Sequence, residues 1–104
     1  MKYVVLFAPE VLTQLDSMRD FIAVAASPII ADRYVDELLV HCQRLSMFPM
    51  RGQARDDLMP GLRITHYRGK ATLAFEVDAA ARTVSILGVF HGRQDYASHL
   101  QAAH

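Results

Sequence analysis

The hydrophobic positions at the start of the chain predict a short strand followed by a helix. Residues 3–7 are β-branched and aromatic, which is typical of a strand. Pro9 then suits the first turn of a helix, and Glu10 suits the positive end of its dipole. Apolar side chains then recur in steps of four and three, at Val11, Leu15, Met18, Ile22 and Ala25. We expect a helix over about residues 9–25.

A second helical pattern follows after a short break. Ser27 is a good N-cap and Pro28 a good first helical residue, and the pattern extends to about residue 47. Arg33 and Glu37 are four residues apart and could pair on its outer face. Its apolar stripe comprises Ala31, Tyr34 or Val35, Leu38, Cys42 and Leu45. The short break predicts that the two helices form an antiparallel hairpin.

After residue 61, the spacing of the hydrophobic residues changes from that of helices to that of strands. Residues 62–68, 71–77 and 84–90 read as three strands, joined by a tight turn at 68–70 and a longer turn at 78–83. Short loops imply an antiparallel meander. The order β-α-α-β-β-β predicts an α+β fold, in which the two-helix hairpin packs on an antiparallel sheet whose last strand is central. At 104 residues, the chain is expected to form one domain over residues 1–104.

Two of the predicted strands are apolar on both sides. In the first, Tyr3, Val5 and Phe7 point to one face and Val4 and Leu6 to the other. In the last, Val84, Ile86 and Phe90 point to one face and Leu87 and Val89 to the other. Two helices can cover only one face of such a sheet. The tail from Tyr96 onward could fold over the other face, or a partner peptide could cover it, and we favour the partner.

Charge and composition narrow the class of protein. The formal net charge is zero, but residues 44–70 hold six basic and two acidic groups. A neutral chain is a poor non-specific binder of nucleic acid, so these arginines are either a local patch or ordinary solvated groups. No apolar run is long enough to cross a membrane, and the N-terminal one is too short for a signal peptide. The single cysteine, Cys42, rules out an internal disulfide, and we expect a cytoplasmic location.

The sequence contains no motif for a metal, a cofactor or a nucleophile. The five histidines show no metal-ligand spacing, and there is no phosphate loop or nucleophile elbow. What remains is a polar set, namely Arg51, Arg55, Arg63, Arg68, His91, Arg93 and Tyr96. Such a set could serve a metal-free ribonuclease, in which arginine stabilises phosphate charge and His or Tyr moves protons. It could equally bind an acidic protein surface.

Several segments, taken in order, resemble a known family. They are residues 45–52 (Leu-Ser-Met-Phe-Pro-Met-Arg-Gly), 55–58 (Arg-Asp-Asp-Leu), 60–63 (Pro-Gly-Leu-Arg) and 91–95 (His-Gly-Arg-Gln-Asp). With Ser27-Pro28 and residues 31–34 they cover nearly the whole chain, and they are similar to the RelE/ParE superfamily of toxins, most of all its ParE branch. The resemblance implies a toxin of a type II toxin–antitoxin module, of the kind linked to plasmid stabilisation. The antitoxin of such a module wraps the toxin with its C-terminal segment.

The resemblance also carries expectations about the target. ParE-type toxins act on DNA gyrase without catalysis, whereas RelE-type relatives cut mRNA on the ribosome. Because a ribosome-bound nuclease should be strongly basic, we expect a gyrase inhibitor; a ribosome-dependent endoribonuclease or a degenerate antitoxin-binding protein is the alternative. The expected target-binding residues are Arg51, Arg55, Arg63, His91, Arg93 and Tyr96. The expected antitoxin-binding residues are Tyr3, Val5, Phe7, Leu87 and Val89. No catalytic residue, cofactor, membrane contact or sequence-specific DNA contact is expected.

Overall fold

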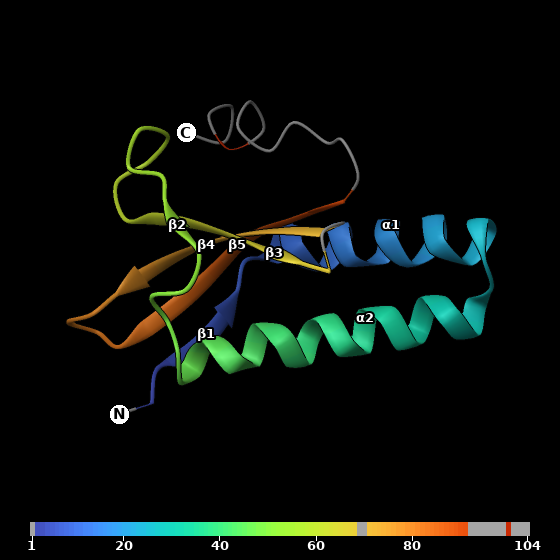
Figure 1. Cartoon of the computed structure of the whole chain (residues 1–104), viewed down its shortest axis with the longest axis horizontal. Coiled ribbons are helices and arrows are strands. Elements are labelled where there is room, and N and C mark those ends of the chain that lie inside the picture. Colours follow the sequence, from blue (N-terminus) through green and yellow to red (C-terminus); the bar gives the residue numbers. More distant parts are fainter. Residues whose placement is uncertain (1, 69–70, 92–99, 101–104) are drawn as a thin grey trace.

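Two antiparallel helices pack on one face of a five-stranded sheet (Figure 1). This computed structural model describes residues 2–68, 71–91 and 100. The elements are β1 (Val4–Phe7), α1 (Pro9–Ala25), α2 (Pro28–Gln43), a 3-10 turn η1 (Arg44–Ser46), β2 (Gln53–Ala54), β3 (Leu62–Tyr67), β4 (Ala71–Asp78) and β5 (Thr83–His91). The predicted α+β class is confirmed, and the short strand β2 is an addition to the predicted elements.

Local signals set the bounds of both helices. Pro9 opens α1, and Pro28 opens α2 behind Ser27, whose Oγ accepts a 3.2 Å hydrogen bond from the backbone N–H of Ile30. α2 ends at Gln43, earlier than the predicted residue 47, because the chain tightens into η1. Most of the predicted apolar stripes is buried, with Val11, Leu15 and Met18 from α1 and Ala31, Val35, Leu38 and Cys42 from α2. At the end of α1, however, Ile22 is only partly buried and Ala25 is exposed.

The strand order is β1-β5-β4-β3-β2, and one pairing differs from the prediction. Every neighbouring pair is antiparallel except β1 and β5, which run parallel. A short loop obliges its two strands to run antiparallel, whereas β1 leads into the helical hairpin and its direction is free of that constraint. β5 lies inside the sheet between β1 and β4, so the last strand is not at an edge, but the central position predicted for it belongs to β4.

A β-bulge in β5 changes which of its side chains face the helices. Ala74 pairs with Gly88 and Phe75 pairs with Ile86, which leaves Leu87 as an extra residue. The extra residue reverses the alternation, so that Val89 joins the core beneath the helices and Phe90 joins Leu87 on the opposite face. The prediction that Phe90 shares a face with Val84 and Ile86, and Val89 with Leu87, is therefore wrong.

Apolar side chains pack on both faces of the sheet. The larger cluster lies beneath the helices and includes Met18, Leu38, Leu73, Phe75 and Ile86. The smaller cluster lies on the opposite face and comprises Leu62, Ile64, Ala74, Phe90 and Leu100. Leu100 is 6% exposed, so this one described residue beyond β5 packs on the face that we had expected a partner to cover. Near the edge strand β1, however, Val4 and Leu6 remain 59% and 49% exposed.

Candidate functional site

The side chain of Arg63 holds the loop that precedes β2. Its Nε donates to the carbonyl of Arg51 at 2.9 Å, and its Nη2 donates to the carbonyls of Met50 and Gly52 at 2.9 and 3.0 Å. A planar guanidinium can satisfy several acceptors at once, which suits it to binding a curved stretch of backbone. Arg63 therefore anchors three consecutive residues of the loop to β3.

Gly52 allows the same loop to approach β3 closely. Its φ is +74°, a left-handed conformation that favours glycine. A Cβ at this position would overlap the carbonyl of Ile64 and would lie 2.9 Å from the Cβ of Thr65. The next residues then pair with β3, with Gln53 opposite Ile64 and Ala54 opposite Arg63. The glycine and the Arg63 side chain thus act together on the position of residues 50–52.

The segment that Arg63 anchors presents apolar side chains to solvent. We call residues 47–51 the exposed loop: Met47, Phe48 and Met50 are 57%, 61% and 66% exposed. The guanidinium carbon of Arg51 lies 5.8 Å from the centroid of the Phe48 ring, within the range of a cation–π contact. The exposed loop therefore combines large apolar side chains with a cation on a short stretch of chain.

The loop between β2 and β3 is held by its two aspartates. Arg55 makes a bidentate pair with Asp57, with two 2.9 Å contacts, and this pair lowers the pKa of the Asp57 carboxyl. The Oδ1 of Asp56 accepts a 2.9 Å hydrogen bond from the backbone N–H of Gly61. The two carboxylates therefore organise the loop, as adjacent acids in a turn commonly do.

The structure brings together only part of the predicted target-binding set. Arg51, Arg55 and Arg63 lie on or next to β2 and β3, whereas the His91 ring lies 4.8 Å from the ring of Phe21, on α1. In the sheet, Arg63 pairs with Phe75 of β4, whereas His91 pairs with Ala71 of the same strand. Ala71 and Phe75 are four residues apart along β4. That offset is about 13 Å along the sheet. Arg93 and Tyr96 lie outside the described residues.

The predicted antitoxin-binding residues are mostly part of the core. Tyr3, Val5 and Phe7 are partly buried against the helix-side cluster, and Val89 is only 2% exposed within it. Leu87 is partly buried against the opposite cluster. The exposed apolar residues of β1 are the alternate ones, Val4 and Leu6.

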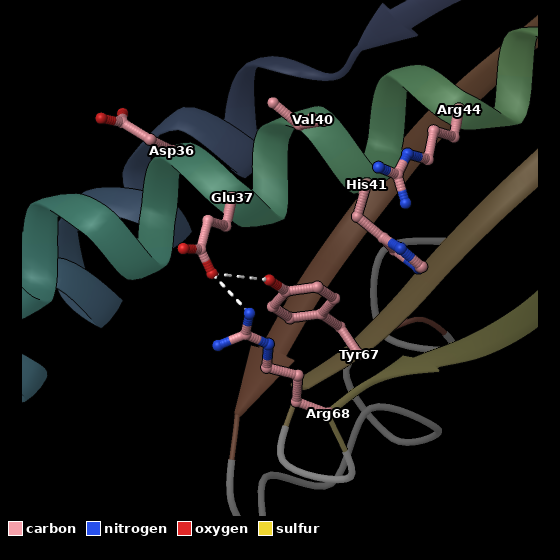
Figure 2. A pocket seen from close by; sticks show the side chains of 7 residues that line it. All are labelled: Asp36, Glu37, Val40, His41, Arg44, Tyr67 and Arg68. Carbon is pink, nitrogen blue, oxygen red and sulfur yellow. Dashed lines mark hydrogen bonds and ion pairs between the residues drawn. The ribbon is translucent and has the colours of Figure 1, made fainter.

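A pocket of about 530 Å³ lies between α2 and the end of β3 (Figure 2), and only Arg68 of its lining belongs to the polar set named from the sequence. Its lining residues are Asp36, Glu37, Val40, His41, Arg44, Tyr67 and Arg68. Glu37 pairs with Arg68 at 2.6 Å and accepts a 3.4 Å hydrogen bond from the hydroxyl of Tyr67. The predicted partner of Glu37 was Arg33, on the same helix, and this prediction is wrong. Glu37 and His41 do stand four residues apart on α2, but the residues that complete the pocket come from a distant part of the sequence.

The ionisable groups of the pocket are shifted by burial and by one another. Burial lowers the pKa of His41, and the nearby guanidinium groups of Arg51 and Arg44 lower it further. Burial likewise raises the pKa of the hydroxyl of Tyr67. The rings of His41 and Tyr67 lie with their centroids 4.9 Å apart. His41 is therefore held in its neutral form at neutral pH.

Two further findings limit the chemistry of the described residues. Within residues 2–68 and 71–91 and at residue 100, no three His, Cys, Asp or Glu side chains are grouped so that they could hold a metal ion. In the same part of the chain, no helix has the length and apolar character needed to cross a membrane.

Solved structures share this fold. The chain is similar to a structure of the chromosomal ParDE TA system from P. aeruginosa, with a TM-score of 0.72 and 21% identity, covering 86% of this chain and 96% of that one. A structure of the RelBE2 toxin–antitoxin complex from Mycobacterium tuberculosis has a TM-score of 0.67 and 22% identity, covering 90% of this chain and 95% of that one. A mutant of the E. coli toxin RelE in the free state has a TM-score of 0.69 and 13% identity, covering 99% of this chain and 97% of that one. At these identities the likeness shows the fold.

The sequence itself identifies the family. No curated protein sequence matches the chain. Residues 5–96, however, match the family described as the ParE toxin of type II toxin-antitoxin system, parDE. This match spans the elements from β1 to β5 and includes both the exposed loop and the Arg63 anchor. The chain belongs to the ParE toxin family of type II toxin–antitoxin systems.

Proposed function

We propose that this ParE-family toxin binds and inhibits DNA gyrase without catalysis, and that a cognate antitoxin neutralises it. The proposal places its action in the cytoplasm, where DNA gyrase works. The single observation that carries it is the exposed loop, in which Met47, Phe48 and Met50 are exposed and the Arg51 guanidinium lies over the Phe48 ring. Apolar side chains of this size with an arginine are typical of the central residues of a protein–protein interface.

The charge of the chain favours a protein target over a nucleic acid. Binding to phosphate backbones requires a surplus of Lys and Arg, and the formal net charge here is zero. Two of the arginines in the middle segment are also engaged internally, since Arg55 binds Asp57 and Arg63 binds backbone carbonyls. Little basic surface is then left for contacts with RNA around the exposed loop.

We assign different roles to the proposed target-binding residues. Arg51, which is exposed beside Phe48, contacts the target directly. Arg63 positions it by holding the loop, and Arg55 stabilises the adjoining turn. His91, Arg93 and Tyr96 are proposed to form a second part of the target-binding surface, near the end of β5.

We propose that the antitoxin docks along β1. This strand is one edge of the sheet, and its outward residues Val4 and Leu6 are exposed. An unpaired edge can accept an added strand from a peptide, while apolar side chains beside it give affinity. Tyr3, Val5, Phe7, Leu87 and Val89 would then support this surface from within, since they are buried or partly buried. The ParDE and RelBE2 structures that share this fold come from toxin–antitoxin systems.

A supercoiling assay with purified DNA gyrase tests the proposed target. The wild-type protein should inhibit supercoiling, and a double variant, Phe48→Ala with Arg51→Ala, should lose this inhibition while keeping its melting temperature. Arg33→Ala, which removes an exposed arginine from α2, is the matched control and should inhibit like the wild type. Gyrase that stays fully active with the wild-type protein, together with translation-dependent mRNA cleavage in induced cells, would reject the proposal in favour of a ribonuclease.

Co-expression and thermal denaturation test the proposed antitoxin surface. A peptide that binds only the native state raises the melting temperature, by an amount that grows with its concentration. Leu6→Glu should remove this rise and the neutralisation of toxicity, because it places a charge at an apolar contact. Val24→Glu is the control: Val24 is 90% exposed near the end of α1, so its variant should bind the antitoxin normally. An equal rise for both variants would exclude β1 as the docking surface.

A further inference from the structure

The pocket between α2 and β3 has two chemically different ends. Figure 2 shows the carboxylates of Asp36 and Glu37 toward one end of the drawn helix, and the side chains of His41 and Arg44 toward the other. The ring of Tyr67 lies between them and forms the wall opposite the helix. A volume of about 530 Å³ is ample for a small organic ligand.

One end of the pocket is already satisfied by its own side chains. Glu37 binds Arg68 at 2.6 Å and accepts a hydrogen bond from the hydroxyl of Tyr67 at 3.4 Å. The guanidinium of Arg68 also lies over the Tyr67 ring, 5.3 Å from its centroid. These contacts fix the Tyr67 ring as a wall of the pocket, whereas the carboxylate of Asp36, another lining residue, is exposed and points away from that ring (Figure 2).

The other end contains polar groups that the described residues do not satisfy. The Nε2 atom of His41 is buried, and no described residue hydrogen-bonds to it. In the same part of the chain, Arg44 makes no ion pair within 4.0 Å. A buried polar atom without a partner is costly, so native proteins usually pair it with protein, water or a ligand.

The charges around His41 favour an anion at this end. Arg44 faces it from η1 and Arg51 from the loop after η1, and both lower the pKa of His41. The remaining charged or titratable groups of the pocket, namely Asp36, Glu37, Tyr67 and Arg68, lie on α2 or at the end of β3, and the Glu37 carboxylate is paired with Arg68. An anion placed between His41 and Arg44 would relieve the repulsion between the ring and the two arginines.

We propose that this pocket binds a phosphate monoester of nucleotide size, with its phosphate at Arg44 and His41 and its hydrogen-bond donors toward Asp36. Arginine offers two parallel N–H groups to a phosphate, and a protonated imidazole adds a third donor. The exposed carboxylate of Asp36 accepts hydrogen bonds from hydroxyl or amino groups, and the exposed side chain of Val40 gives an apolar contact for the body of the ligand. An acidic peptide fits less well, because Asp36 and Glu37 would repel its neighbouring carboxylates. None of the described lining residues belongs to the exposed loop or to β1, although Arg51 of the loop lies near the anion-binding end, and the proposal therefore goes beyond the proposed toxin function.

The proposal includes a defined coupling to pH. Burial and the positive charges of Arg51 and Arg44 lower the pKa of His41, and a bound phosphate would oppose the effect of the two arginines, so the ring should take up a proton when the ligand binds. By linkage, affinity should rise as pH falls through the range in which the unliganded ring titrates. This direction distinguishes a ligand that contacts His41 from one that binds elsewhere on the protein.

NMR of the histidine rings, with adenosine 5′-monophosphate as the probe, tests the proposal. We expect saturable shifts of the His41 signals, a dissociation constant on the order of 1 mM or tighter, and at least about tenfold weaker binding of adenosine. Arg44→Gln should weaken binding at least about tenfold, and Arg33→Gln, on an exposed position of the same helix, should leave it unchanged. In His41→Gln, the increase in affinity between about pH 7.5 and about pH 6 should disappear.

Three results would overturn the proposal. The first is the absence of saturable His41 shifts with adenosine 5′-monophosphate. The second is equal binding by the wild type and Arg44→Gln, since both chains then bind without the proposed phosphate contact. The third is equal affinity for inorganic phosphate and for the nucleotide, which would show that Asp36 and Val40 contribute nothing. Because each readout is binding to the free protein, none depends on whether the chain inhibits gyrase.

Discussion

Arg63 donates a 2.9 Å hydrogen bond from its Nε to the main-chain carbonyl of Arg51, so one arginine of the middle segment positions another. The two side chains are of the same type but differ in their surroundings. Arg63 is directed at backbone carbonyls, whereas Arg51 is exposed and lies over the Phe48 ring. Losing Arg63 should therefore change the shape of the exposed loop, while losing Arg51 should change only what the loop presents.

Arg63→Ala should lower both stability and toxicity, because three backbone carbonyls lose their partner. We expect the free energy of unfolding to fall by about 1–2 kcal/mol, the cost of losing partly exposed hydrogen bonds from a charged group. Arg51→Ala should change stability by less than about 0.5 kcal/mol, as exposed substitutions usually do, yet reduce toxicity. Urea unfolding and growth after induction measure the two effects. Equal stability of both variants would remove the anchoring role of Arg63.

Gly52→Ala should be much more damaging than Gly61→Ala, although both glycines have a positive φ, +74° and +81°. At Gly52 a methyl group would overlap the Ile64 backbone carbonyl, whereas at Gly61 its nearest neighbour would be the Glu76 Cγ at 3.5 Å. We expect Gly61→Ala to cost about 1–2 kcal/mol from backbone strain alone, and Gly52→Ala to cost more and to displace the loop from β3. Thermal unfolding of the two variants compares them directly. If Gly61→Ala lowered stability as much as Gly52→Ala, the close approach of Gly52 to the Ile64 backbone would be refuted.

The thiol of Cys42 should be unreactive in the native protein. It is 1% exposed within the core between the helices and the sheet, and burial raises its pKa to about 12. Since the thiolate is the nucleophile, alkylation at neutral pH should proceed only through unfolding and follow its rate or population. Mass spectrometry during a denaturant series would measure this. Rapid labelling without denaturant would contradict the packing of α2 against the sheet.

The stability of the unliganded protein should fall as pH drops below neutral because of His41. Its native pKa lies below the ordinary value of 6.5, so the unfolded state binds the proton first. The contribution of neutral His41 to the free energy of unfolding is therefore fully present well above pH 6.5, and it is lost as pH falls from there through the native pKa. His41→Gln should flatten this decline in denaturant titrations without phosphate. Asp57 acts in a separate range, because its lowered pKa means that its contribution is lost only as pH falls below 3.8.

The sequence by itself determined the features that depend on neighbours along the chain. The helix of residues 9–25 and the N-cap at Ser27 follow from local spacing and capping, and the structure has both. The strands at 62–68, 71–77 and 84–90 and the antiparallel order of these three follow from short-range alternation and short loops. The ordered segments that resemble ParE toxins also lie in the sequence, and the family match confirms them.

Only the tertiary structure decided the features that depend on distant residues. The extra residue Leu87 reverses the faces of Val89 and Phe90, and the alternation of a single strand does not reveal such a bulge. β1 runs parallel to β5 because helices, not a tight turn, follow it. The carboxylate of Glu37 pairs with Arg68, 31 positions away, instead of with Arg33 one turn earlier, since folding brings the end of β3 against α2. For the same reason, the pocket around His41 exists only once both halves of the chain are packed together.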